Sequence, residues 1–147
     1  MFKNILVPTD GSKLSQKAVK EAIELARATS AKVTALHVYP KFSGSPYGTF
    51  GPAEDVLEEA HKNQSRAEAD KLFAAFRKLT DAAGVALETV LVESNDVWKQ
   101  VIATAKKKKC DLVCMASHGR RGVSGVLLGS ETNKVLTHSD IPVLVLR

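Results

Sequence analysis

The residues best suited to chemistry lie in a glycine-rich stretch, residues 115–130, with the sequence MASHGRRGVSGVLLGS. Glycines permit left-handed turns and a close approach of backbone N–H groups to an anion. A helix expected to begin near Ser130 would add N–H donors and the positive end of its dipole. The Ser130 hydroxyl and the guanidinium group of Arg120 or Arg121 could bind phosphate oxygens. This composition predicts a phosphate-binding loop whose glycines are Gly119, Gly122, Gly125 and Gly129.

The same loop has a plainer interpretation. Neither of the common phosphate-binding patterns, G-x-G-x-x-G and G-x-x-x-x-G-K-[ST], occurs in it. It would then be a surface loop in which Ser130 only caps the following helix. His118 belongs to this loop and could contact a phosphate, whereas His37 falls inside an expected strand and is predicted to be a core residue with satisfied hydrogen bonds. Spacing alone leaves both interpretations of the loop open.

A second polar group, Thr9-Asp10-Gly11-Ser12, directly follows an apolar run that ends at Pro8. Asp10 could accept hydrogen bonds from a ribose or bind a phosphate-bound magnesium ion, or it could cap the first helix together with Ser12. Phosphotransferases that begin D-x-D after a first strand carry a nucleophilic aspartate where this chain has Pro8, so no aspartyl-phosphate can form here. A G-x-S-x-G elbow for a nucleophilic serine is also absent. We therefore expect no catalytic residue and no metal cluster, and favour binding over catalysis.

The elements that must position these groups alternate regularly along the chain. Short apolar runs predict strands, and apolar residues at helical spacing predict helices. Ser12 and Ser94 are the expected N-caps of the first and third helices, and Gly84 should end the second. Residues 40–52 contain three glycines and three prolines and are expected to form a loop. The expected strands are residues 3–8, 31–38, 85–92, 111–116 and 141–146, and the expected helices follow residue 12 and span 53–83, 97–105 and 130–137.

This alternation predicts an α/β fold with an open, twisted, five-stranded parallel sheet, right-handed crossovers and helices on both faces. In such sheets ligands bind at the carboxyl ends of the strands, where the winding direction reverses. The polar group after Pro8, the residue Val38 and the glycine-rich stretch all fall at carboxyl ends of expected strands. The fold therefore predicts one site at which they meet.

Length and composition define the class of molecule. The chain has 147 residues, of which 44% are hydrophobic and 25% charged, which predicts a single folded domain over residues 1–147. No apolar run approaches the roughly 20 residues needed to span a bilayer, and no signal peptide is recognisable, so we expect a cytoplasmic protein without a membrane partner. Cys110 and Cys114 lack the C-x-x-C spacing and are expected to be buried apolar residues.

Positive charge is concentrated in the C-terminal third of the chain. Residues 97–147 hold 9 Lys and Arg against 3 Asp and Glu, whereas residues 1–96 hold 12 against 13. Such a field suits a phosphate-bearing ligand but is less clustered than a duplex-binding surface. The four lysines at residues 106–109 end a helix and lack interleaved aromatic residues, which favours a solvated helix end over a nucleic-acid patch.

Over its whole length the chain resembles small members of the universal stress protein family. The resemblance is carried by Val7-Pro8-Thr9-Asp10-Gly11-Ser12, by Leu36-His37-Val38 and by the ending Ser139-Asp140-Ile141-Pro142-Val143-Leu144-Val145. The nucleotide-binding branch of the family has the pattern G-x-x-G, nine residues, then G-[ST]. Gly119, nine residues and Gly129-Ser130 match its second half, and Ala116 stands where the first glycine belongs. An alanine is tolerated there at a strand end, but matters if the residue needs a positive φ or touches the ligand.

The resemblance implies a Rossmann-like fold of the adenine nucleotide alpha hydrolase-like type, with ATP lying across the switch point between the first and fourth strands. It places adenine and ribose near Thr9, Asp10 and Val38, with Asp10 the contact for any accompanying magnesium ion. Phosphates would lie on Ser117, Gly119, Gly129 and Ser130. The full set of implied nucleotide-binding residues is Pro8, Thr9, Asp10, Val38, Met115, Ala116, Ser117, His118, Gly119, Arg120, Gly129, Ser130, Glu131 and Thr132.

The resemblance also implies a stress-response regulator that forms a homodimer through its last strand, between Ile141 and Leu146. Val143 and Val145 would point to one face of that strand and Leu144 to the other, so an edge strand there could pair with a second copy. The strand could equally be internal or covered by the long helix. Two alternatives to an ATP-binding regulator stay open: an ATP-independent, chaperone-like dimer and a slow ATPase.

Overall fold

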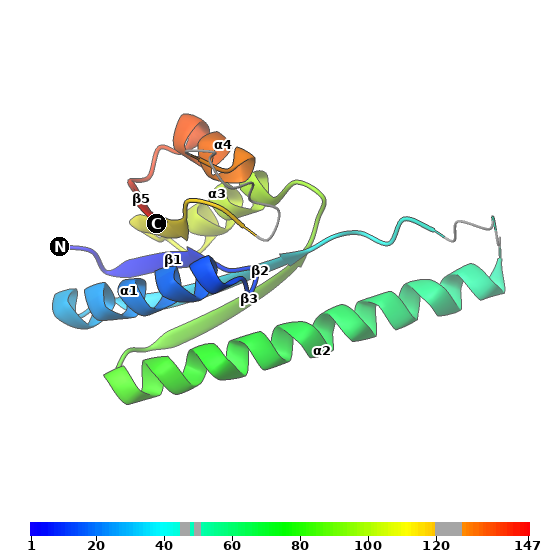
Figure 1. Ribbon diagram of the computed structural model, residues 1–147, viewed down its shortest axis with the longest axis horizontal. Coiled ribbons are helices and arrows are strands. Elements are labelled where there is room, and N and C mark those ends of the chain that lie inside the picture. Colours follow the sequence, from blue (N-terminus) through cyan, green and yellow to red (C-terminus); the bar gives the residue numbers. More distant parts are fainter. Residues whose placement is uncertain (45–47, 49–50, 120–127) are drawn as a thin grey trace.

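A computed structural model describes residues 1–44, 48, 51–119 and 128–147. Strands and helices alternate along it, as predicted (Figure 1). The elements are β1 (Asn4–Pro8), α1 (Lys13–Thr29), β2 (Lys32–Tyr39), α2 (Pro52–Ala83), β3 (Leu87–Glu93), α3 (Val97–Lys107), β4 (Leu112–Ala116), α4 (Ser130–His138) and β5 (Val143–Leu146).

Three strands begin one residue later than predicted, and β3 and β5 begin two residues later, each of these two for a local reason. β3 begins at Leu87 rather than at residue 85, because the N–H of Val85 donates to Thr80 O at 2.9 Å and closes the end of α2. β5 begins at Val143 rather than at residue 141, after Pro142, which has no N–H to donate to a ladder.

The sheet is parallel throughout, in the order β3-β2-β1-β4-β5, which confirms the predicted fold class. The chain winds outwards from β1 to β2 and β3, then returns to the other side of β1 to form β4 and β5. Leu6 is in register with Thr34 of β2 on one side and with Val113 of β4 on the other. The winding direction therefore reverses between β1 and β4, so the segments that follow these two strands leave the sheet at the same edge.

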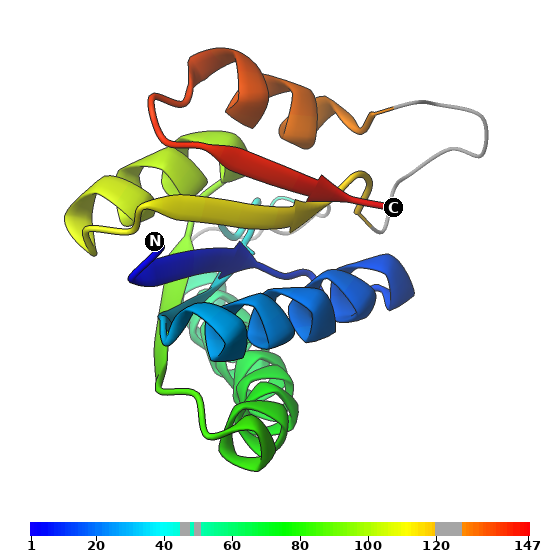
Figure 2. The same ribbon diagram turned by 90° about the vertical axis from the view of Figure 1, so that its left-hand side faces the viewer.

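Helices cover both faces of the sheet (Figure 2). Helices α1 and α2 pack on one face over a cluster that includes Ile5 and Val7, and α3 and α4 pack on the other over a cluster that includes Leu6. All three of these β1 side chains are 0% exposed. Because successive side chains of a strand point to opposite faces, a strand covered on both sides is apolar on both, as this one is from Ile5 to Val7.

Local signals marked most helix ends correctly. The Ser12 hydroxyl caps α1 as predicted, and α2 ends at Gly84, whose φ of 66° is left-handed.

The prediction that Ser94 caps α3 is wrong. The cap residue is Asp96, whose side chain makes no capping hydrogen bond, and the Ser94 hydroxyl accepts the N–H of Asp96 at 3.1 Å. A side chain from α4 takes the capping role instead, because Glu131 Oε2 accepts the N–H of Trp98 at 2.8 Å.

The lysines and cysteines near the end of α3 have structural roles. Lys108 forms an ion pair with Glu88 of β3, and Lys106 Nζ lies 3.1 Å from Asp140 Oδ2. Lys109 has a positive φ, at which the chain turns out of the helix. These lysines are thus spread over different neighbours. Cys110 and Cys114 are free and buried, as predicted.

Helix α2 is longer than the sheet it covers, and its N-terminal part extends beyond the carboxyl edge of the strands (Figure 1). Val56 and Leu57, near that end, are 68% and 43% exposed. Among the helices of the described ranges, none combines the length and apolar character needed to cross a membrane.

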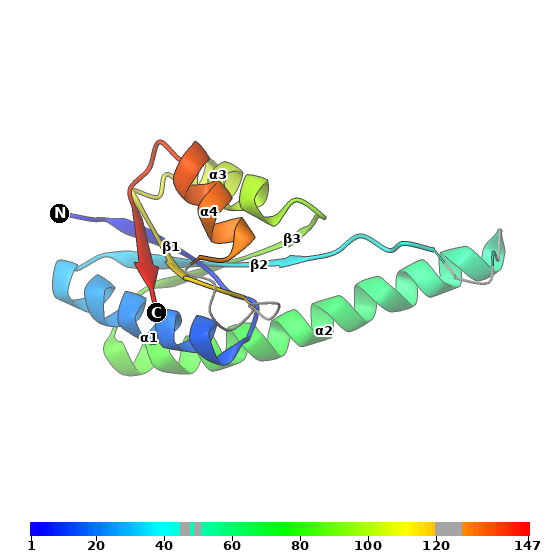
Figure 3. The same ribbon diagram turned by 45° about the horizontal axis from the view of Figure 1, so that its top comes forward.

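β5 is an edge strand of the sheet, beside β4 (Figure 3). Ile141 and Val143 pack against the cluster under α3 and α4, whereas Leu146 packs against the cluster under α1 and α2. Leu144 is 38% exposed. The predicted division of this strand between two faces is confirmed.

Candidate functional site

The turn after β1 is held by hydrogen bonds among its own groups. Asp10 Oδ1 accepts the N–H of Ser12 at 3.0 Å, and the Ser12 hydroxyl accepts the N–H of Ser15 at 3.2 Å. The hydroxyls of Thr9 and Ser15 lie 2.5 Å apart, and both residues are buried. Gly11 has a φ of 77°, which glycine adopts without strain. Ser12 is therefore the cap of α1, and Asp10 supports this cap residue through one of its two carboxylate oxygens.

Ser15 and His37 support this turn from either side. The Ser15 hydroxyl accepts the N–H of Asp10 at 3.3 Å, and His37 Nδ1 lies 2.8 Å from Thr9 O. His37 is half-buried rather than the core residue that the sequence predicts, and the contact with Thr9 gives a hydrogen-bond partner to its Nδ1. Ser15 was missed from the sequence, although its position three residues after Ser12 at a helix start was an available signal. Together these contacts fix the direction in which Asp10 leaves β1.

The other oxygen of Asp10 faces the segment that follows β4. A Cβ added to Gly119 would lie 2.6 Å from Asp10 Oδ2 and 3.7 Å from Asp10 Cγ. The φ of Gly119 lies outside the left-handed range, so the left-handed turn that a glycine permits is not formed here, and lack of space is the reason for a glycine. The structure thus brings the two predicted halves of the site into contact.

Gly129 closes the connection between β4 and α4. Its N–H donates to Ser117 O at 2.7 Å, and the N–H of Ser117 donates to Leu146 O, also at 2.7 Å. The φ of Gly129 is −66°, so a left-handed turn is again not the reason for glycine. A Cβ there would lie 3.1 Å from Ser117 O and 3.4 Å from His118 Cα. Gly129 therefore does allow a close approach of two segments, but the segment that its backbone approaches is the end of β4.

Ala116 fits the conformation of its position. It is the last residue of β4, in register with Leu146, and is not among the residues with positive φ. Its carbonyl oxygen accepts the hydroxyl of Thr132 at 3.0 Å, which fastens α4 to the end of β4. Met115, just before it, is buried in the cluster under α3 and α4. The backbone at residue 116 therefore has no requirement for glycine.

Helix α4 begins with open backbone donors. Its cap residue is Gly129, and no side chain in the described part of the chain caps it. Ser130 is the first helical residue and is exposed, so the interpretation of Ser130 as the helix cap is wrong. The Glu131 carboxylate is directed to the start of α3, where it accepts the N–H of Trp98, and also lies 3.5 Å from Lys134 Nζ. The start of α4 can therefore offer backbone N–H groups to an anion.

The carboxyl end of β2 completes this edge of the sheet. Val38 is half-buried and packs against the cluster under α3 and α4. Burial, followed by the nearby Glu93 carboxylate, raises the pKa of Tyr39 above its usual value. The ring of His61, from α2, lies 6.1 Å from that of Tyr39 and its Nε2 lies 2.8 Å from Pro40 O. The chain that leaves β2 is therefore anchored to α2.

Some residues predicted for the phosphate-binding loop lie outside the described residues: Arg120, Arg121, Gly122 and Gly125.

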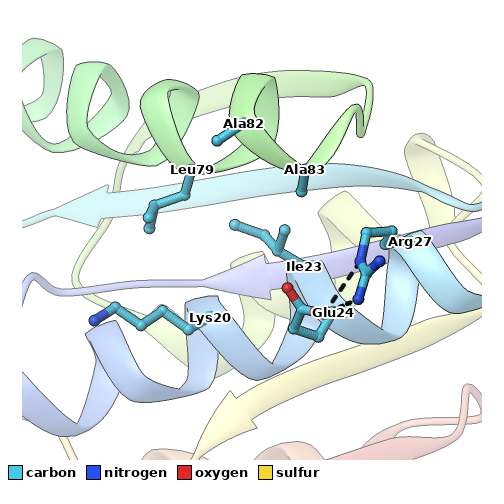
Figure 4. Close-up of a pocket in the computed structure, with 7 residues that line it drawn as sticks. All are labelled: Lys20, Ile23, Glu24, Arg27, Leu79, Ala82 and Ala83. Carbon is cyan, nitrogen blue, oxygen red and sulfur yellow. Dashed lines mark hydrogen bonds and ion pairs between the residues drawn. The ribbon is translucent and has the colours of Figure 1, made fainter.

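A cavity of about 560 Å³ lies elsewhere, in the groove between α1 and α2 (Figure 4). Ile23 and Leu79 are among its apolar lining residues, and Glu24 and Arg27 line it as an ion pair at 2.6 Å. No residue from a strand end lines it. The polar groups at the ends of β1 and β4 thus form a separate site.

The fold and this polar edge together define a doubly wound α/β protein with its candidate site at the β1/β4 switch point. The chain belongs to the universal stress protein family, whose model matches residues 1–147. The family assignment made from the sequence is confirmed.

Similar proteins agree with this assignment. The chain is 31% identical to universal stress protein MJ0531 of Methanocaldococcus jannaschii over 100% of this chain and 83% of that protein. The structure of UspA from Lactobacillus plantarum is 26% identical, with a TM-score of 0.85 over 99% of this chain and 97% of that one. A universal stress protein crystallised in complex with cAMP is 26% identical, with a TM-score of 0.69 over 99% and 97% of the two chains.

Proposed function

We propose that this protein is a cytoplasmic stress-response regulator that binds ATP across the β1/β4 switch point, with residues 1–147 acting as one domain. Adenine and ribose would contact Thr9, Asp10 and Val38. The phosphates would lie at the start of α4, near Gly129 and Ser130. Binding, rather than catalysis, is the proposed output.

The observation that carries this proposal is the uncapped start of α4. Within the described residues no side chain accepts its first N–H groups, and an anion at this end is favoured by the helix dipole. Gly129 keeps the approach free of a side chain, and Ser130 is exposed at the same helix end. A phosphate group supplies the charge and the acceptor oxygens that such a helix start can bind.

The nature of the nucleotide is argued from a relative and from charge. A universal stress protein 26% identical to this chain has been crystallised with cAMP, which supports an adenine nucleotide. The choice of a triphosphate rests on the C-terminal third of the chain, where residues 97–147 hold 9 Lys and Arg against 3 Asp and Glu.

A magnesium ion bound to the ATP would be held by Asp10. Magnesium sites in nucleotide-binding proteins combine one or two carboxylates with phosphate oxygens and water. The carboxylate of Asp10 lies against Gly119, beside the proposed phosphates, and so fits this donor set. The ion would neutralise part of the triphosphate charge.

We expect negligible ATP hydrolysis without a partner, because binding a triphosphate does not by itself position or activate an attacking water. Phosphate release from purified protein with magnesium measures it. Asp10→Ala serves as the control for a contaminating ATPase. Rapid release that depends on Asp10 would contradict the proposal and favour an enzyme.

We further propose a homodimer that forms through β5. This edge strand carries the exposed Leu144, and its outer backbone groups could pair with the same strand of a second copy about a two-fold axis.

Mass spectrometry of the small molecules released when the purified protein is denatured tests the nucleotide. Calorimetric titration with ATP, ADP, AMP and adenosine then ranks the ligands. We expect ATP to bind most tightly and adenosine most weakly. No binding of any of these compounds would contradict the proposal and favour an ATP-independent protein.

A further inference from the structure

Two large apolar side chains on the outer face of α2 are left uncovered. Val56 and Leu57 are 68% and 43% exposed, on the part of α2 that extends beyond the strands (Figure 1). The residues that α2 buries, among them Ala69 and Phe76, lie on the opposite side of the helix, toward α1, β2 and β3. Adjacent exposed apolar residues of this size mark an interaction surface. The charges of the helix indicate its partner.

Charge changes sign along α2. Residues 52–61 hold 4 Asp and Glu and no Lys or Arg, whereas residues 71–78 hold 3 Lys and Arg and no acidic residue. The helix dipole explains Glu54 and Asp55 in the first turn, but α2 has no basic residue in its last turn, so the dipole does not explain the basic segment. A helix that is acidic toward one end and basic toward the other is complementary to a second copy of itself in the antiparallel direction.

Four charged residues on one flank of the exposed face set the register of such a pair. They are exposed and have no ion-pair partner in the part of the chain that the structure describes: Glu59, Arg66, Asp70 and Arg77. With a two-fold axis at Ala67, Glu59 lies about 3 Å along the helix from the partner's Arg77, and Arg66 is equally close to the partner's Asp70. By symmetry each of these pairs of opposite charges occurs twice.

The small apolar residues of the face fit the same register. Ala60, Ala67 and Ala74 follow one another at intervals of seven residues, which is two helical turns, and all three are exposed on the side of Val56 and Leu57. An axis at Ala67 places Ala60 opposite the partner's Ala74, so the two backbones can approach closely. An axis half an interval away would also pair alanines, but it would bring acidic side chains of the flank together. The charges therefore favour the axis at Ala67.

We propose that the outer face of α2 is a second interface between copies of this chain, in which two α2 helices pair antiparallel with Ala67 on the two-fold axis. The aliphatic stem of the partner's Lys78 would lie between Val56 and Leu57 and cover them. Because one helix from each copy forms the contact, the buried area is small, and we expect a Kd of about 0.1–1 mM, weaker than pairing through β5. The inference does not rest on the proposed nucleotide site.

Cysteine crosslinking tests the direction and the register, in a Val145→Pro background that removes pairing through β5. Under mild oxidation Ala67→Cys should form a disulfide between two copies, because position 67 meets itself on the axis. Ala60→Cys alone should not, since its two copies would lie about 21 Å apart, but it should crosslink to Ala74→Cys when the two variants are mixed. Non-reducing electrophoresis measures the products. The Val145→Pro parent, whose Cys110 and Cys114 are buried, is the control.

Charge reversal tests the ion pairs in the same background. In sedimentation equilibrium at about 0.5 mM, Arg77→Glu and Glu59→Arg should each weaken self-association about fivefold or more. The double variant should restore it, because opposite charges meet again. Melting temperatures check that each variant is folded.

Three outcomes would overturn the inference: a parent that is monomeric at this concentration, which would leave a different protein as the occupant of the face; a disulfide between two copies of Ala60→Cys; or a double variant that associates no better than the single ones. Because no nucleotide takes part in these measurements, they leave the proposed function untouched.

Discussion

The Asp10 carboxylate occupies the space that a side chain at position 119 would need, since a Cβ on Gly119 would lie 2.6 Å from Asp10 Oδ2. Gly119→Ala should therefore displace this carboxylate and weaken ATP binding about tenfold, a change of about 1.4 kcal/mol. The same substitution in an Asp10→Ala background should have little further effect, because the clash is gone.

A double-mutant cycle with calorimetry measures this coupling. Equal losses from Gly119→Ala in both backgrounds would show that glycine is needed at position 119 for a reason other than Asp10.

Gly129 lies where the proposed phosphates approach the start of α4. Gly129→Asp should abolish ATP binding, because it adds a negative charge beside the N–H groups that the phosphates need. Gly129→Ala is the matched control, since it adds only a Cβ, 3.1 Å from Ser117 O. We expect an intermediate affinity for the alanine variant in calorimetry. Wild-type affinity in the aspartate variant would exclude phosphates from this helix end.

Asp111 links the starts of β1 and β4 and should make stability depend on pH. Burial alone would raise its pKa, but the N–H groups of Asn4 and Lys3 donate to the carboxylate and hold the pKa below the usual 3.8. Because the folded-state pKa is depressed, this stabilisation is present above the unfolded value and is lost as the pH falls through the folded value.

Urea unfolding of wild type and Asp111→Ala at pH 7, 5 and 3 measures this stabilisation. We expect a difference in unfolding free energy of about 1–3 kcal/mol at pH 7. It should shrink below about pH 4, where the carboxylate begins to protonate. A difference that is the same at pH 7 and pH 3 would contradict the assignment.

The ladder between β4 and β5 identifies the backbone groups that are free for a dimer. The N–H of Val113 donates to Pro142 O, and that of Ser117 donates to Leu146 O. Because direction alternates along a strand, Leu144 also faces β4, whereas Val143 and Val145 direct their N–H and C=O groups outward. Val145→Pro should therefore remove an outward donor and leave the bonds to β4 in place.

Sedimentation velocity at tens of micromolar is the measurement for this edge. We expect wild type and the control Val145→Thr, which keeps the N–H, to be dimers and Val145→Pro to be a monomer. A monomeric wild type would reject the dimer. A proline variant that stays dimeric would place the interface on another element, most plausibly α2.

The buried thiols should report on unfolding. Burial, followed by the charge of Glu21, raises the pKa of Cys114 to about 12, and burial also raises that of Cys110. At pH 8 both thiols should therefore react with a disulfide reagent only slowly in the folded protein and rapidly in denaturant, as measured by the thiolate absorbance released. Fast reaction of either thiol under native conditions would show that the segment around it opens locally.

The order of elements and the class of fold could be predicted from the sequence because the signals are local. The apolar run of β1 reflects cover on both faces, and the cap at Ser12 and the turn at Gly84 act within a few residues. The same local reasoning failed for Ser94. The group that serves the start of α3 is Glu131, which lies 33 residues beyond its partner Trp98. A capping rule that considers neighbours in sequence cannot identify such a partner.

By itself the sequence determined which residues could form a site and that they fall at strand ends. Only the tertiary structure decided how they meet, because strand order and register bring together groups that are distant in the chain. Pairing of β1 with β4 places Asp10 against Gly119, and the hydrogen bond from Gly129 to Ser117 brings the start of α4 to the end of β4. Gly119 and Gly129 do not use the positive φ that glycine permits. They are needed because a side chain at either position would meet a neighbouring segment, which is a property of packing between segments.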